Sequence, residues 1–159
     1  MRFVDASQDA WRAVADGAAP SPAPHSLLTL AQWREARGAW PQDVPVAVAV
    51  PNDAAIEELA DDLPRIGLVV LHFPKWTDGR AYSQARLLRV RFRYGGAVRA
   101  TGAVLVDMVP MLVRTGFDEA ALRDDQKRET AERALRFFPA HYQADVHAHR
   151  PLYARRTAA

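Results

Sequence analysis

Residues 65–80 read RIGLVVLHF (65–73) and then PKWTDGR (74–80), and this change from an apolar run to a polar loop decides the fold. The run is short, continuous and rich in β-branched residues, so it predicts a strand that is buried on both faces. The stretch that follows, AYSQARLLRVRFRY (81–94), carries apolar side chains at helical spacing and predicts a helix. A buried strand, a short loop and a helix form the repeating unit of a parallel sheet.

The same alternation extends to both sides of this unit. Strands are expected at 44–50, 65–73, 97–105 and 117–122, and helices at 30–37, 53–62, 81–94, 107–114 and 124–138. The fold class is therefore α/β, with a mostly parallel sheet of about four strands covered by helices. Two arrangements fit this pattern, an open doubly wound sheet or half of a (β/α)₈ barrel that forms a homodimer.

Residues that commonly begin or end helices mark several of these boundaries. The expected N-terminal caps are Thr29 with Gln32 as a capping box, Asp53, Asp78 or Thr77, Asp107 and Asp124. Gly38, Gly95 with Gly96, and Gly116 are expected to end helices. The 159 residues are expected to form a single α/β domain, with an irregular arm at 1–25 and a C-terminal tail at 140–159.

Composition excludes several classes of protein. The chain has no cysteine, so it forms no disulfide and offers no thiolate to a metal or an iron–sulfur cluster. It contains no apolar run long enough for a membrane helix and no secretory signal, so we expect a cytoplasmic protein without membrane contact. The net charge of +2 and the absence of a nucleic-acid-binding motif argue against nucleic acid as a partner.

The charge is nevertheless distributed unevenly along the chain. Residues 1–64 carry a net charge of −6, residues 65–116 carry +7 and residues 117–159 carry +1. The basic middle segment indicates a local positive field and a negatively charged partner or ligand. A GC-rich genome explains the number of arginines equally well, but it does not explain their clustering.

The junction between the strand 65–73 and the helix 81–94 is the candidate site. It lies at the carboxyl end of a strand and the amino end of a helix, where backbone amides attract anions. The expected anion-binding residues are Lys75, Arg80, Tyr82, Ser83, Arg86 and, from the next strand, Arg99. A purely structural alternative remains, in which Asp78 is a cap, Gly79 is a turn residue and the arginines are solvated.

Acid–base candidates are His72, Asp78 and Asp107, although no catalytic motif surrounds them. Arg99 lies in the expected strand 97–105, whose apolar composition predicts burial. A buried arginine needs a carboxylate partner, and we expect that partner to be Asp78 or Asp107. The spacing of His141, His147 and His149 is too loose to predict a metal site.

The central stretch resembles a bacterial family called Domain of Unknown Function 934. The resemblance rests on FPKWTDGRAYSQARLLR (73–89) and continues through RATG (99–102), VLVD (104–107) and RTGFD (114–118). Three residues differ from the family pattern, because Ala81 replaces a glycine, Ala103 replaces an acidic residue and Thr115 replaces a cysteine. Any family chemistry that uses that thiol is therefore absent from this chain.

The resemblance implies a role in assimilatory sulfate reduction, because genes of this family typically lie beside sulfite reductase genes. The resemblance makes sulfite reductase the expected partner. Members of the family are often labelled as oxidoreductases, yet this chain has no recognisable cofactor motif. The cofactor is therefore unknown, and whether the protein is an enzyme is left open. Three interpretations stand together: an accessory protein of sulfite reduction, a small enzyme or sensor that binds an oxyanion or a phosphorylated ligand, and a purely structural interaction module.

Overall fold

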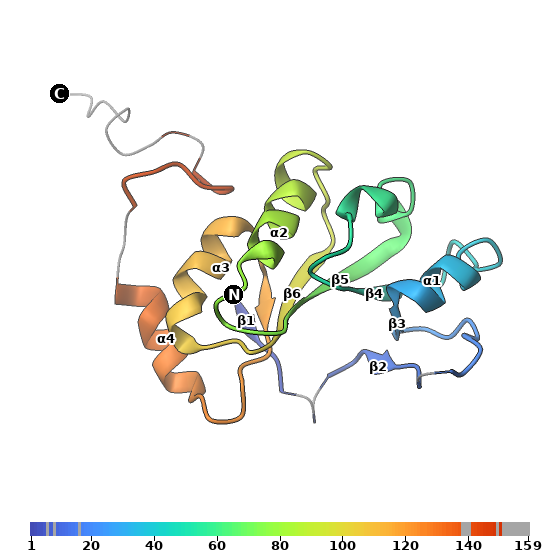
Figure 1. Ribbon diagram of the computed structural model, residues 1–159, viewed down its shortest axis with the longest axis horizontal. Helices are drawn as coiled ribbons and strands as arrows, with labels where there is room; N and C mark the ends of the chain where they lie inside the picture. The colour runs from blue at the N-terminus through green and yellow to red at the C-terminus, as the bar shows by residue number, and fades with distance from the viewer. Residues whose placement is uncertain (6, 8, 16, 138–140, 149, 151–159) are drawn as a thin grey trace.

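A seven-stranded, wholly parallel sheet organises the computed structural model, which describes residues 1–5, 7, 9–15, 17–137, 141–148 and 150 (Figure 1). The strands are β1 (Arg2–Phe3), β2 (Arg12–Ala13), β3 (Ser26–Thr29), β4 (Val46–Val50), β5 (Ile66–Phe73), β6 (Ala97–Gly102) and β7 (Glu119–Ala120). The α-helices are α1 (Leu30–Ala36), α2 (Arg80–Val90), α3 (Val109–Thr115) and α4 (Arg128–Phe137). Short 3₁₀ turns are η2 (Ile56–Leu59), η3 (Leu63–Arg65) and η4 (Val106–Met108).

The order of the strands makes the sheet a half-barrel. It runs β1-β7-β6-β5-β4-β3-β2, so the strands from β2 to β7 lie side by side in chain order. Successive crossovers of the same hand then place the helices on one face of the sheet. The expected α/β class and parallel sheet are confirmed. The expected number of about four strands is wrong, because β1, β2 and β3 are too short to show a pattern.

The two faces of the sheet differ in the size of their side chains. On the convex face, Val46, Val48 and Val50 join the main core under the helices. On the concave face, Ala47 packs in a second, smaller cluster with Leu68 and Val70. Small side chains on this face leave room for other groups above the sheet.

The N-terminal segment fills part of that room. β1 and β2 lie at opposite edges of the sheet, separated by six strand spacings, or about 29 Å if the sheet were flat. The connection from Phe3 to Arg12 reaches about 32 Å at most, so it must cross the sheet directly. Trp11 lies over Gly67, where a Cβ would come within 3.3 Å of the indole ring. The described residues of the segment 1–14, here called the strap, therefore cross the lower part of the concave face (Figure 1).

The start of α1 and the end of α3 lie where the capping box and the glycine predict them. α1 begins at the expected capping box, in which the Gln32 amide donates to Thr29 Oγ1 at 3.2 Å and the Thr29 amide donates to Gln32 Oε1 at 2.9 Å. α3 ends at Gly116, which adopts a left-handed conformation with φ of 106°. Within the described residues, none of the helices has the length and apolar character needed to cross a membrane.

Helix starts that rested on an aspartate alone were wrong. The segment 53–62 forms only the short turn η2 instead of an α-helix, and the N-cap of η2 is Ala55, not Asp53. Asp107 lies inside η4, and the N-cap of α3 is Met108. α4 begins at Arg128, four residues after Asp124. α2 ends at Val90, before Gly95 and Gly96 are reached.

Candidate functional site

The loop after β5 brings Asp78 and Arg80 together. Arg80 donates to the Asp78 carboxylate from Nε at 3.0 Å and from Nη2 at 2.7 Å, and the Arg80 amide donates at 3.3 Å. These hydrogen bonds from Arg80 hold the pKa of Asp78 well below its ordinary value. Gly79 is the N-cap of α2, so the expected side-chain cap from Asp78 or Thr77 is not formed. Asp78 neutralises Arg80, which leaves this cation less available to a ligand.

Tyr82 belongs to the packing between α2 and the sheet. Its ring lies edge-on to Phe73, with centroids 5.0 Å apart, and to Phe117 at 6.3 Å. Burial raises the pKa of Tyr82 to about 12, so the phenol stays protonated at neutral pH. The hydroxyl therefore offers a hydrogen bond but no negative charge.

Three of the expected anion-binding residues are free on the surface. Lys75, Ser83 and Arg86 are exposed, and neither Lys75 nor Arg86 has a carboxylate partner among the described residues. Trp76, beside Lys75 in the same loop, leaves 58% of its surface exposed. The loop thus presents one uncompensated cation, Lys75, beside a large aromatic ring, and α2 presents a second cation, Arg86.

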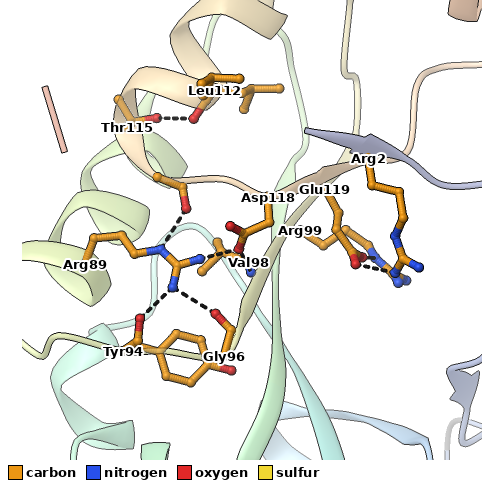
Figure 2. Close-up of polar contacts among 12 residues, drawn as sticks. Arg2, Arg89, Tyr94, Gly96, Val98, Arg99, Leu112, Thr115, Asp118 and Glu119 are labelled. Carbon is orange, nitrogen blue, oxygen red and sulfur yellow. Dashed lines mark hydrogen bonds and ion pairs between the residues drawn. The ribbon is translucent and has the colours of Figure 1, made fainter. Parts of the chain in front are cut away.

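Arg99 lies elsewhere, on the concave face of β6. It donates to Glu119 Oε2 at 2.8 Å and to Asp9 Oδ1 at 3.1 Å, and Arg2 pairs with Glu119 from β1 (Figure 2). The expectation of Asp78 or Asp107 as its partner was wrong. Glu119 is the register neighbour of Arg99 in β7, and Asp9 arrives with the strap. Arg99 is therefore separated by the sheet from the cations of α2.

Burial opposes the ionisation of Asp9, but the hydrogen bonds and charge of Arg99 outweigh this effect and hold the pKa of Asp9 below its ordinary value. The Arg99 side chain is only 3% exposed. A cation this deeply buried requires both carboxylates, because removing one partner leaves charge uncompensated. The cluster of Arg2, Asp9, Arg99 and Glu119 is thus a structural clasp between the strap and the sheet.

Two polar residues of α2 that the sequence did not single out hold neighbouring loops. Arg89 donates to the carbonyls of Gly116 at 2.9 Å and Gly96 at 2.8 Å, and it pairs with Asp118 (Figure 2). Gln84 is buried and donates through Nε2 to the carbonyls of Pro51 at 2.8 Å and Ala54 at 2.9 Å. Local sequence pattern predicts neither role, because the carbonyls that Arg89 and Gln84 bind lie in loops that only the fold brings to α2.

The three acid–base candidates lie in three separate places. Asp78 is paired with Arg80, and Asp107 is exposed in η4. His72, at the end of β5, faces an open groove of about 600 Å³ on the concave side. The groove lies at the carboxyl ends of the strands, where half-barrels and barrels hold their ligands. Among the described residues, no three histidine or acidic side chains gather as metal ligands; His149 lies outside them.

The sequence matches the family model described as "Bacterial protein of unknown function (DUF934)" over residues 47–153. The chain belongs to the DUF934 family. No curated protein matches it significantly. The DUF934 match begins in β4 and therefore includes His72, the loop after β5 and α2. It leaves out α1, the strap and Asp9, the partner of Arg99.

Two departures from the DUF934 pattern fit their surroundings. Ala81 is fully buried in the first turn of α2, so its methyl group contributes to the core. Thr115 donates its hydroxyl to the carbonyls of Met111 at 2.9 Å and Leu112 at 3.1 Å, inside its own helix (Figure 2). A hydroxyl at this position is satisfied by the backbone alone.

Proposed function

We propose that this protein is a cytoplasmic accessory protein of assimilatory sulfite reduction, which docks an acidic partner on the loop after β5 and the exposed side of α2. The partner that the family resemblance implies is sulfite reductase. The observation that carries the proposal is the exposed Trp76 flanked by Lys75, with Arg86 on the adjoining helix and no carboxylate bound to either cation among the described residues.

Charge supports this surface. Of the basic residues in the segment 65–116, five are neutralised by carboxylates: Arg65, Arg80, Arg89, Arg91 and Arg99. Lys75 and Arg86 keep their full charge for a partner. Complementary charge accelerates encounter between proteins, and it acts most strongly at low ionic strength.

Trp76 supports the proposal independently of charge. Tryptophan and arginine are over-represented among the residues that dominate binding energy at protein interfaces. An indole ring that is 58% exposed gains apolar burial when a partner covers it. The loop thus supplies an apolar anchor within a basic surface, which is the usual composition of an interface core and its rim.

Binding to purified sulfite reductase, measured by surface plasmon resonance at low and at physiological salt, tests the proposal. The double variant Lys75→Glu/Arg86→Glu should weaken binding by at least about tenfold, the effect of roughly 1.4 kcal/mol. The matched control Lys127→Glu/Arg133→Glu changes the net charge equally at two exposed positions, one just before α4 and one within it, and should bind as the wild type does. Trp76→Ala should weaken binding without changing its salt dependence.

Calorimetry separates the alternative functions. Saturable heat with sulfite, sulfate, phosphate or adenylyl sulfate that disappears in Lys75→Glu/Arg86→Glu, without any binding to the reductase, assigns the surface to a small oxyanion. Absence of binding to the reductase at low salt and of heat with every anion leaves the loop a purely structural turn. Either result overturns docking of the reductase.

A further inference from the structure

The groove on the concave face is open because nothing in the described fold covers it. The helices occupy the convex face, and the strap reaches the lower part of the concave face through Trp11. Above Trp11, the groove is floored by Ala49 and Val70, toward the carboxyl ends of β4 and β5. Small and aliphatic side chains there form an apolar base, and its volume of about 600 Å³ suits a small molecule.

His72 presents a polar group at this base, and its ring is held in position. Nδ1 lies 3.4 Å from Thr101 Oγ1, and the ring packs beside Gly102 in β6. Gly102 has φ of +88°, and a Cβ at this position would collide with the ring. Nε2 has no hydrogen-bond partner among the described residues. Nε2 can therefore donate to a ligand oxygen. The single proton of the Thr101 hydroxyl is shared between His72 Nδ1 and the Leu71 carbonyl at 3.5 Å, so Thr101 orients the ring and does not donate to the ligand.

Asp53 supplies the opposite charge from the loop after β4. It is exposed and lines the groove, and the described residues place no cation within ion-pair distance of it. Arg80 contributes a more distant positive potential, but its guanidinium is held by Asp78. The other charged residue of the groove, Arg34, is bound through Nε and Nη2 to Glu58 at 2.9–3.1 Å. Asp53 is thus the one carboxylate of the groove left for a ligand.

We infer that this groove binds a small zwitterion of the amino-acid class. The ligand's ammonium group pairs with Asp53, its oxyanion accepts a hydrogen bond from His72 Nε2, and its aliphatic part rests on Val70 and Ala49. A ligand with only one of these charges leaves one polar group of the groove unmatched and binds more weakly. Neither Lys75 nor Arg86 lines the groove, so this proposal can be tested independently of the proposed docking surface.

Calorimetry and ligand-detected NMR with L-alanine, L-serine and L-leucine, each compared with propionate and ethylamine, test the inference. At least one zwitterion should bind, and about tenfold more tightly than either singly charged analogue. Asp53→Asn and His72→Phe should each weaken zwitterion binding by about tenfold or more, since each removes one charge-assisted or polar contact. Asp61→Asn and His147→Gln, which change exposed groups outside the groove, should bind as the wild type does, and so should Lys75→Glu/Arg86→Glu.

Three results would overturn the inference. The first is the absence of binding by every zwitterion in a folded protein. The second is binding that Asp53→Asn leaves intact, which would show that the ammonium group is not recognised there. The third is a homodimer in light scattering that Ala49→Arg dissociates, because a second copy of the chain would then occupy the groove.

Discussion

Asp62 shows how one residue can connect distant parts of the chain. Its carboxylate is buried and accepts hydrogen bonds from the Trp33 indole at 3.0 Å, from Arg65 at 2.6 Å and from Arg37 at 3.3 Å. Burial opposes ionisation, but these donors together hold the pKa of Asp62 below its ordinary value of 3.8. A folded-state pKa below the unfolded value means that ionised Asp62 stabilises the fold, and that protonation removes this contribution.

Asp62→Asn is therefore expected to cost about 1–2 kcal/mol of the free energy of unfolding at neutral pH, because the amide keeps an acceptor for Trp33 but loses the charge. The contribution of the carboxylate is complete above 3.8 and is lost as the pH falls through the lowered folded-state value, so the difference from wild type should shrink in acid. Urea denaturation followed by circular dichroism across this pH range measures it. The exposed neighbour Asp61 provides the control Asp61→Asn, and an unchanged pH profile in Asp62→Asn would refute the assignment.

At the residue scale, the sequence predicts the need for a partner but not its identity. A charged Arg99 in an apolar strand requires a carboxylate, and the structure provides two. Asp9 lies ninety residues away in the chain and Glu119 lies twenty away. Choosing between them and Asp107 requires the register of β6 against β7 and the path of the strap. Neither follows from local pattern, because both depend on pairing across the sheet.

At the element scale, α1 is short enough that its start matters. It has seven residues, and the reciprocal hydrogen bonds of Thr29 and Gln32 satisfy two of its free amides. Thr29→Ala should lower the free energy of unfolding by about 1 kcal/mol, and Thr29→Ser should restore most of it. Thermal or urea denaturation measures both. Thr77→Ala is the control, because Thr77 is exposed and its side chain makes no hydrogen bond to the described residues. Equal stability of both alanine variants would contradict the role of the cap.

The elements recovered from the sequence are those with an apolar pattern of their own. β4 and β5 are continuous apolar runs, and α2 has buried residues at helical spacing. By contrast, β1 and β2 have two residues each, and only pairing with a neighbour makes them strands. The segment 53–62 has an aspartate at the expected cap but buries only Ile56 and Leu59 in η2, so one apolar turn suffices. A cap residue therefore predicts a helix poorly when no apolar helical face follows it.

At the scale of the whole molecule, the strap completes a half-barrel that the helices leave open on one side. The alternation of strands and helices predicts the strand order. It does not predict that the strap crosses the concave face. The strap is held at two points, by the ion pairs of Asp9 with Arg99 and by Trp11 over Gly67. Backbone hydrogen bonds from the Arg12 amide to His25 and from the Val14 amide to Leu27 then join it to β3. The strap therefore ties both edges of the sheet into one structure.

Trp11→Ala should release this tie. Trp11 is half-buried against the smaller apolar cluster, so we expect a loss of about 2 kcal/mol, somewhat below the cost of truncating a fully buried aromatic residue. Hydrogen exchange of the Arg12 and Val14 amides should accelerate more than that of central β5, because the edge opens before the core. Trp76→Ala removes an equally large ring from an exposed loop and should change neither quantity. If both tryptophan variants prove equally stable, with equal protection at Arg12 and Val14, the strap does not hold the concave face.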